Sequence, residues 1–366
     1  MRFLAKHTHV LKNVLRSDHP KCALLSYITD PFLTDRAFHT NVRESRVLAK
    51  VIGGFGFRVD AVDYNFVGPI DYQDYELLLG FGDPMERSFD YSTELTRVCY
   101  MTGANVCYQN FAEIRRIKNV SAMTHYRLLP KRIVPWIWSR SITMADALLV
   151  VGNQWTKSTY ESVTDLPVHC VNATAFINDR VVDFMRDFSR ARYSFLWFGG
   201  SGLIHKGLDL CLGVFARHPD WNLHICGPKE DDFFQAFARD IERPNVRFHG
   251  LIDATSDSFA EIASRCMFAV LPTCSEGQST ALLTAMGAGL IPIATEYSGI
   301  DVQQYGFKIE SLTVDALESE MEKAIETSST ELEQMSANAR DHVLTSHNLA
   351  SFESAIGAIL SEYIQS

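Results

Sequence analysis

Two loops in the second half of the chain carry glycine, charged and small polar residues in patterns that suit an anionic ligand. The first loop contains Gly199, Gly200 and Ser201, followed by His205 and Lys206, and it leads into a predicted helix. Glycines let the backbone approach a ligand closely, a helix N-terminus offers free N–H groups, and the lysine adds a positive charge. The loop therefore suits a diphosphate, although a glycine-rich turn with a solvated lysine has the same spacing.

The second loop places a carboxylate before a run of small polar residues. Glu276 is followed by Gly277, Gln278, Ser279 and Thr280, and then by another predicted helix. Backbone N–H groups and side chains in such an array can hold sugar hydroxyls and phosphate oxygens together. The alternative is that the Glu276 carboxylate only caps the helix.

Both loops follow short apolar runs, and such runs alternate with amphipathic stretches along the whole chain. This alternation predicts parallel strands with helices between them. Ligands bind at the carboxyl ends of the strands in such sheets, so we expect the two loops to hold two parts of one ligand. The predicted strands are residues 23–27, 57–62, 76–79, 97–101, 147–151, 168–171, 195–198, 223–226, 246–249, 268–271 and 291–294.

The strand pattern stops over a polar stretch, residues 172–192, and then restarts. A chain of 366 residues exceeds the usual size of one compact core, so two domains are expected. We predict an α/β fold of two Rossmann-like, doubly wound domains, residues 1–174 and 175–345. Residues 346–366 are predicted to form a helix with one apolar stripe that packs back on the domains.

Composition narrows the class of protein. The formal net charge of −10 argues against a nucleic-acid-binding protein that works through an excess of basic residues. The eight cysteines form no C-x-x-C pair, which favours reduced, buried thiols. The N-terminus lacks the apolar segment of a signal peptide, and no run of 18 apolar residues occurs. We therefore expect a cytoplasmic protein, at most peripheral on the inner face of the membrane.

Residues 195–299 resemble the donor-binding domain of retaining GT-B glycosyltransferases of family 4. The first half matches only loosely, as expected for an acceptor-binding domain. The resemblance implies a GT-B fold, with the two domains facing each other across a cleft. The matching stretches, in the family's order and spacing, are residues 198–200, 206–207, 225–227, 245–250, 269–272, 275–277, 285–289 and 291–295.

The resemblance also implies roles for single residues. Lys206 would bind the diphosphate of a nucleotide sugar, and Glu276 would hold hydroxyls of the donor sugar close to the reacting centre. The segment around His249 would lie near the nucleotide base. The other implied donor-binding residues are Gly199, Gly200, Ser201, His205, Gly227, Gly277, Gln278, Ser279, Thr280 and Thr284.

Two of these positions depart from the family's pattern. The family usually has an arginine where this chain has Ser201, and a second glutamate, which grips the ribose, where this chain has Thr284. One diphosphate cation and one ribose ligand are therefore replaced. His205 and an arginine from the other domain are the candidates to compensate for the missing cation.

The resulting prediction is transfer of a sugar from a nucleoside-diphosphate sugar to a glycan or lipid-linked acceptor, as in bacterial surface-polysaccharide assembly. No Asp-x-Asp motif is present, so we predict transfer without a metal ion and without a cofactor. Retention of configuration is implied by the resemblance alone. Two alternatives remain open, a GT-B-fold nucleotide-sugar epimerase and a non-catalytic nucleotide-sugar-binding subunit.

The acceptor side is less sharply indicated by the sequence. His39, Thr102 and Asn105 follow or flank predicted strands of the first half and are candidates to lie near the reacting sugar. Each is also a plausible structural hydrogen-bonding residue.

Residues 115–140 contain seven basic residues, no acidic residue and two tryptophans. Such a segment favours contact with an anionic membrane surface, whereas its alternative is a solvated basic helix with buried tryptophans.

Overall fold

The computed structural model of the chain describes residues 9–34, 40–91, 94–180 and 186–364. The chain divides into two compact units. The first comprises Met1–Ala104, Trp136–Thr174 and Asn348–Ser366, and the second comprises Asn105–Pro135 and Ala175–His347. The segment 105–135 therefore packs with the second half of the chain, although it precedes two strands of the first unit.

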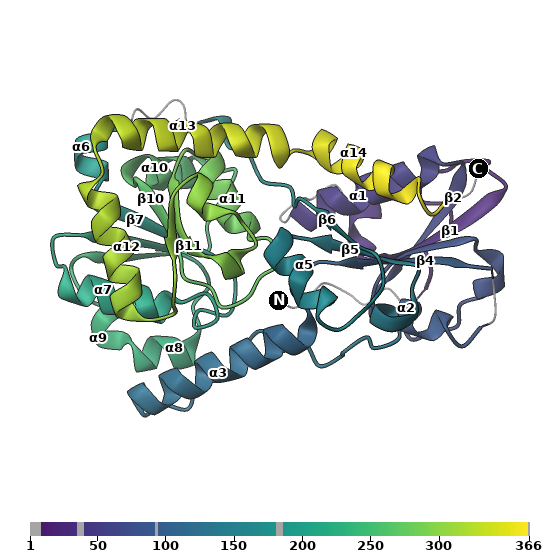
Figure 1. The fold of residues 1–366 in the computed structure, drawn as a ribbon, viewed down its shortest axis with the longest axis horizontal. Coiled ribbons are helices and arrows are strands. Elements are labelled where there is room, and N and C mark those ends of the chain that lie inside the picture. The colour runs from purple at the N-terminus through teal and green to yellow at the C-terminus, as the bar shows by residue number, and fades with distance from the viewer. Residues whose placement is uncertain (1–8, 35–39, 92–93, 181–185, 365–366) are drawn as a thin grey trace. The chain divides into compact units, whose positions relative to one another are not determined.

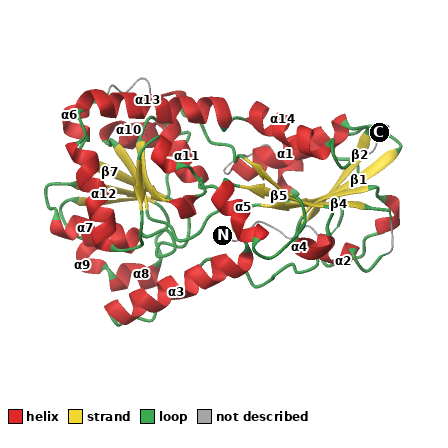
Figure 2. Cartoon of the chain, viewed as in Figure 1, coloured by secondary structure: helices red, strands yellow, loops and turns green. Residues whose placement is uncertain are grey.

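The first unit is built on a parallel sheet of six strands in the order β2-β1-β3-β4-β5-β6. Strands β1, β3 and β5 are buried along almost their whole length because helices cover the sheet, which explains their largely apolar sequences (Figure 2). The strands are β1 Lys21–Tyr27, β2 Phe57–Asp63, β3 Leu77–Gly80, β4 Thr96–Met101, β5 Ala147–Val151 and β6 Val168–Val171.

Five α-helices of the first unit surround this sheet in the described part of the chain. The last of them packs against the first, and Lys50 pairs there with Glu353. The helices are α1 Thr40–Gly54, α2 Asp83–Ser88, α4 Ser141–Met144, α5 Gln154–Glu161 and α14 Leu349–Leu360, with 3-10 turns η1 Asp30–Phe32 and η2 Tyr72–Asp74.

The second unit also has a parallel six-stranded sheet, in the order β12-β11-β10-β7-β8-β9. Its strands are β7 Ser194–Phe198, β8 Asn222–Cys226, β9 Val246–Gly250, β10 Phe268–Leu271, β11 Ile291–Thr295 and β12 Phe307–Ile309. The 3-10 turns η4 Glu296–Ser298 and η5 Val302–Gln304 also belong to this unit.

Helices cover both faces of this second sheet (Figure 1). Two pairs pack directly on each other, α7 with α12 and α11 with α13. The helices are α3 Val106–Thr124, α6 Phe188–Ala191, α7 Leu208–Arg217, α8 Asp231–Ala236, α9 Ala238–Ile241, α10 Asp257–Arg265, α11 Thr280–Gly287, α12 Val314–Glu326 and α13 Ser329–Ser346.

The strand order of the second sheet reverses between β7 and β10. From β7 the chain builds β8 and β9 outward on one side, and it then returns to build β10, β11 and β12 on the other. The loops that follow β7 and β10 therefore lead away in opposite directions, which opens a crevice at the carboxyl ends of these two strands. This topological switch point is where a ligand of such a sheet is expected to bind.

The predicted fold class is confirmed, since both sheets are parallel and lie between helices. All eleven predicted strands are present, and their boundaries differ by at most one residue at each end, except that β1 begins at Lys21, two residues before the predicted start. The sequence reasoning missed β12, which has only three residues and lies at the edge of its sheet. So short a strand gives too little alternation or apolar length to stand out from a loop.

Candidate functional site

The two loops predicted to bind a ligand meet at the switch point of the second sheet. Gly207, at the end of the first loop, has φ +69°, and a Cβ there would lie 2.2 Å from the carbonyl oxygen of Pro272. Only glycine permits this crossing of the two backbones. The amide of Cys274 also donates to the carbonyl of His205 at 2.9 Å. Glycine and backbone pairing thus fix one loop against the other.

Lys206 and Glu276 form a buried ion pair at this crossing. The Lys206 ammonium contacts Glu276 Oε1, and both side chains are more than nine-tenths buried. Trp197 Nε1 donates to the Lys206 carbonyl at 3.2 Å and holds the backbone of the lysine. The sequence reasoning required these two residues to lie together, and the structure brings them into contact.

The surrounding charges govern how the pair titrates. Burial alone raises the pKa of the Glu276 carboxyl, but the charges of Lys206, Arg132 and His205 outweigh it and lower the pKa to about 2. Burial lowers the pKa of the Lys206 ammonium and Arg132 lowers it further, whereas Glu276 opposes both. Glu276 therefore carries its negative charge at any pH near neutrality.

A second cation, Arg132, stands beside the pair. Its Nη2 lies 3.7 Å from Glu276 Oε2, and its side chain remains about a third exposed, at 36%. One carboxylate thus faces two cations, Lys206 and Arg132. The arrangement leaves a positive charge to spare, which favours an anionic ligand.

His205 is a structural link rather than an open ligand group. It is fully buried, with Nδ1 2.8 Å from Glu113 Oε2 and Nε2 on the carbonyl oxygen of Ser275. Both ring nitrogens therefore have partners within the protein. Burial alone raises the pKa of Glu113, but its contacts with His205 lower it overall. His205 therefore has no ring nitrogen left for the cation role that sequence reasoning offered it.

The same glutamate orders the segment that carries Arg132. Glu113 Oε1 accepts from the amides of Lys131 at 2.7 Å and Arg132 at 3.2 Å. The helix that carries Glu113 is anchored in turn by a buried ion pair in which Arg116 Nη2 lies 2.6 Å from Asp209 Oδ1. Helix α3 and the segment after it are therefore tied to the first loop and to α7.

Glu230 occupies the amides of the first loop. Its carboxylate accepts from the amide of Gly202 at 2.6 Å, from the amide of Leu203 at 3.3 Å and from the hydroxyl of Ser201 at 3.0 Å. Gly199 and Gly200 lie before this contact, and a Cβ at Gly200 would meet no atom within 4 Å. The open part of the loop is therefore at Gly200, and Lys206 is the cation of the loop.

The second loop ends at the N-terminus of α11. Ser279 caps this helix, with its hydroxyl 3.4 Å from the amide of Leu282. Gln278 Nε2 donates to the carbonyl of Gly299 at 3.2 Å, and a Cβ at Gly299 would lie 1.7 Å from the Gly277 carbonyl oxygen. Thr280 begins the helix. The N-cap of α11 is Ser279 and not Glu276, so the alternative that Glu276 only caps the helix is wrong.

Thr284, where the family usually has its second glutamate, is buried within the fold. Its hydroxyl donates to the Thr280 carbonyl at 2.7 Å and accepts from the Phe176 amide at 3.3 Å. It ties α11 to the chain that enters the second unit, and this is a structural role.

Gly227 and His249 lie on the other side of β7, where the next strands end. A Cβ at Gly227 would lie 2.9 Å from the carbonyl oxygen of Gly199, so glycine lets the loop after β8 approach the first loop. His249 belongs to the edge strand β9, and its Nε2 lies 3.0 Å from His224 Nδ1. Its predicted place near a nucleotide base stays a prediction.

The predicted acceptor residues belong to different parts of the chain. Thr102 is exposed and follows β4 in the first unit. Asn105 is buried as the N-cap of α3, with its side chain 2.9 Å from the Cys107 amide. His39 lies outside the described residues.

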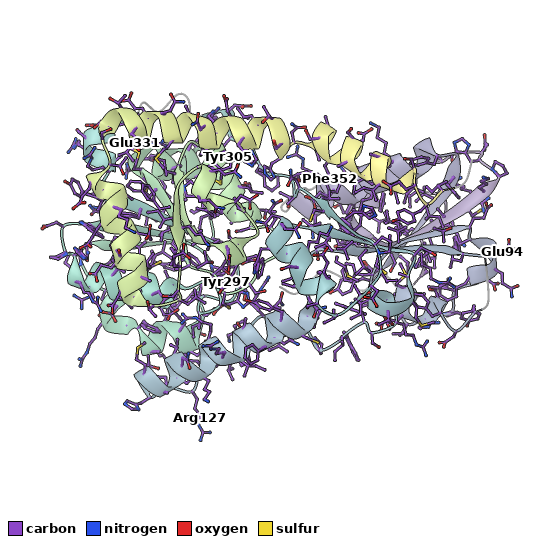
Figure 3. All side chains as sticks on the ribbon, in the orientation of Figure 1. Glu94, Arg127, Tyr297, Tyr305, Glu331 and Phe352 are labelled. Atoms are coloured by element: carbon purple, nitrogen blue, oxygen red, sulfur yellow. The ribbon has the colours of Figure 1, made fainter. Side chains whose placement is uncertain are left out.

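The basic segment 115–140 divides into two groups. Arg115, Lys118 and Arg127 are exposed, and the Arg127 side chain projects away from the end of α3 (Figure 3). The other four basic residues pair with carboxylates: Arg116 with Asp209, Lys131 with Asp232, Arg132 with Glu276 and Arg140 with Asp90.

Sequence reasoning missed Glu113, Arg132 and Glu230 as neighbours of the two loops. Arg132 was noted only as part of the basic run. Their signal was weak, because each lies far in sequence from the residue it contacts. The one available hint was Glu113, a lone acid directly before the basic run.

None of the helices in the described residues has both the length and the apolar character of a membrane-spanning segment. Within the same residues no group of three or more His, Cys, Asp or Glu side chains is placed to hold a metal ion.

Residues 192–327, all within the second unit, match the family Glycosyl transferases group 1. The matched stretch contains Lys206, Glu276 and both loops. No curated protein matches the chain in sequence.

Solved structures of glycosyltransferases resemble the chain over nearly its whole length. Sucrose-phosphate synthase from Thermosynechococcus elongatus has 14% identity and a TM-score of 0.64, covering 93% of this chain and 98% of that one. WaaG, a glycosyltransferase involved in lipopolysaccharide biosynthesis, has 17% identity and a TM-score of 0.56, covering 93% and 99%. HepE from Anabaena, in complex with UDP and glucose, has 10% identity and a TM-score of 0.60, covering 94% and 100%. The shared fold is GT-B.

Proposed function

We propose that the protein transfers a sugar from a nucleoside-diphosphate sugar to a saccharide acceptor. The observation that carries the proposal is the buried contact between Lys206 and Glu276 at the switch point of a Glycosyl transferases group 1 domain. A cation and a carboxylate side by side match the two ends of such a donor, a diphosphate and a sugar with hydroxyl groups.

The transfer step makes specific electrostatic demands. As the glycosidic bond to the diphosphate breaks, negative charge grows on the leaving diphosphate and positive charge on the anomeric carbon. Lys206 stabilises the diphosphate together with the free N–H groups at the start of α11. Glu276 stays ionised and accepts hydrogen bonds from sugar hydroxyls near the reacting carbon. We propose that these groups suffice without a metal ion, and that the configuration is retained.

A UDP-sugar is the first donor to test. HepE, which shares the fold, was solved in complex with UDP and glucose. The identity of the nucleotide base has no other support in the structure. Thr284, at the position of the family's ribose ligand, forms its hydrogen bonds within the fold.

The acceptor that we propose is a glycan or a lipid-linked saccharide, in polysaccharide assembly on the cytoplasmic face of a membrane. WaaG is involved in lipopolysaccharide biosynthesis, which supports such an acceptor. On α3, the exposed basic residues Arg115 and Lys118 lie among the exposed apolar residues Phe111, Ile114 and Met123. A helix face of this composition binds anionic lipid surfaces.

The membrane contact has its own test. Arg115→Glu with Lys118→Glu should reduce co-sedimentation with phosphatidylglycerol vesicles several-fold, because each basic residue near an anionic surface contributes about 1 kcal/mol. Arg239→Glu with Lys323→Glu is the charge-matched control, on exposed basic residues of α9 and α12. Unchanged co-sedimentation of the double variant would remove the membrane part of the proposal and leave the transfer reaction untouched.

The central experiment incubates the purified protein with a panel of UDP-, GDP- and ADP-sugars, with and without saccharide acceptors. Transfer, or slow hydrolysis of one donor, supports the proposal. Interconversion of the donor sugar without acceptor indicates an epimerase. Binding that raises the melting temperature without any turnover indicates a non-catalytic subunit, and a complete absence of binding overturns the proposal.

A further inference from the structure

We propose that Arg132 is the second cation of the diphosphate site and takes over the charge that Ser201 does not supply. This inference rests on the proposed function and deepens it, because it assigns a residue outside the two loops to the same ligand group. Arg132 lies in the segment after α3, about seventy positions before the first loop.

The position of the Arg132 guanidinium is the first support. Its Nη2 lies 3.7 Å from Glu276 Oε2, at the carboxylate that also contacts Lys206. The distance is too long for a good hydrogen bond, so the fork of N–H donors is not committed to Glu276. The Arg132 Nε is buried and has no hydrogen-bond partner among the described residues. A buried guanidinium N–H without an acceptor is costly, and a phosphate oxygen is the acceptor that its geometry fits best.

The packing of the arginine stem shows that this position is built into the fold. Gly202 has φ +91°, and a Cβ there would lie 2.5 Å from Arg132 Cγ. Glycine in the first loop therefore makes room for the Arg132 side chain. The backbone is held as well, because Gln109 Nε2 donates to the Arg132 carbonyl at 2.7 Å and the Arg132 amide donates to Glu113.

Ser201 itself is unsuited to the role of a phosphate partner. Its hydroxyl donates to Glu230, whose carboxylate also takes the next two amides of the loop. The hydrogen-bond donors of residues 201–203 are therefore already paired with the Glu230 carboxylate. Lys206 and Arg132 are the cations that remain within contact of Glu276 in the described structure, with one carboxylate between them.

The test measures binding of UDP, GDP and ADP, each against its nucleoside, by titration calorimetry at two salt concentrations. The variants are Arg132→Gln, Arg132→Lys and Lys206→Gln. Arg127→Gln is the control, since Arg127 belongs to the same basic segment but is exposed and projects away from it (Figure 3). Melting temperatures show whether each variant folds.

We expect Arg132→Gln to weaken diphosphate binding about ten- to hundredfold, the size of one charged hydrogen bond, and to leave nucleoside binding unchanged. The salt dependence of diphosphate binding should become shallower because one cation is lost. Arg132→Lys should recover part of the affinity, since it restores the charge without the planar fork. Arg127→Gln should bind like the unmodified protein.

The outcomes separate this inference from the proposed function. If Lys206→Gln loses diphosphate affinity while Arg132→Gln keeps it, the site stands and the role of Arg132 is refuted. If Arg132→Gln weakens the nucleoside as much as the diphosphate, Arg132 shapes the site without contacting phosphate, and the inference is also refuted. If the unmodified protein binds none of the nucleotides, the proposed function fails and the inference fails with it.

Discussion

Two buried glutamates, one in each unit, have opposite surroundings. Glu44 in α1 accepts hydrogen bonds from the amide of Thr174 at 2.9 Å and from its hydroxyl at 2.8 Å. Burial is the largest influence on it and raises the pKa of its carboxyl above the ordinary value. Glu276 is equally buried, yet Lys206 and Arg132 lower the pKa of its carboxyl to about 2.

The difference separates a structural carboxyl from one in a site prepared for charge. Glu44 ties α1 to the end of the first unit, and its hydrogen-bond donors are neutral. Glu276 contacts two cations, Lys206 and Arg132, whose combined charge exceeds its own. An excess of positive charge in a protein interior is costly, and a bound anion would compensate it. Burial alone therefore does not identify a functional carboxylate, whereas contact with several cationic side chains does.

The largest effect is expected from removing either member of the central pair. Glu276→Gln and Lys206→Ala should each lower kcat by about 10²- to 10³-fold or more, the range for losing one group that stabilises a transition state. Initial rates with the preferred nucleotide sugar provide the measurement. Glu44→Gln is the matched control, and it should change kcat by less than about threefold because it lies in the structural site. Equal losses in both glutamate variants would erase the distinction between the two carboxyls.

The anchoring ion pair between Arg116 and Asp209 should dominate stability. Removing one partner by Arg116→Met leaves a buried carboxylate unpaired, which costs about 3–5 kcal/mol. Urea unfolding followed by tryptophan fluorescence measures the change. The double variant Arg116→Met with Asp209→Leu should recover most of the loss, because it leaves no unpaired charge. A single variant as stable as the unmodified protein would show that α3 is not held by this pair.

The two glutamates should also affect stability with opposite dependence on pH. Glu276 has a lowered pKa in the fold, so its stabilisation is complete above the unfolded value near 4.5 and is lost as the pH falls toward 2. Glu276→Gln should therefore cost more at pH 6 than at pH 3.5, by about 1 kcal/mol. Glu44 has a raised pKa, so its contribution is present below its unfolded value and is lost as the pH rises. The free energy of unfolding of Glu44→Gln should accordingly increase relative to that of the unmodified protein as the pH rises.

Melting temperatures across this pH range measure both trends. The same sign of pH dependence in the two variants would contradict the contrast between their surroundings.

The fold was predictable because its information is local. Most strands of four or more residues are rich in apolar residues and are bounded by glycine, proline or polar residues, so pattern and length were sufficient to find them. The loops of the site were predictable for the same reason, since Gly199, Gly200, Lys206 and Glu276 stand directly after two such runs. The edge strand β12 was not found, because three residues carry too little pattern.

The residues that contact the two loops from elsewhere in the chain were not predictable, because these contacts join positions far apart in the sequence. Arg132 reaches Glu276 across 144 positions of sequence, and Glu113 reaches His205 across 92. Neither spacing carries a signal in a single sequence. Arg132 was grouped with the basic run by composition, whereas the packing of α3 gives the members of that run different partners.

The smallest effect is expected where the family's usual arginine is restored. Ser201→Arg should change diphosphate affinity by less than about threefold, because the new guanidinium would pair with Glu230, which lies 3.0 Å from the Ser201 hydroxyl. The same titrations measure it. Combined with Glu230→Gln, which removes that competing carboxylate, Ser201→Arg should raise diphosphate affinity several-fold and partly rescue Arg132→Gln. If Ser201→Arg alone tightens binding tenfold, Glu230 does not neutralise the first loop, and the reason for recruiting Arg132 from outside that loop disappears.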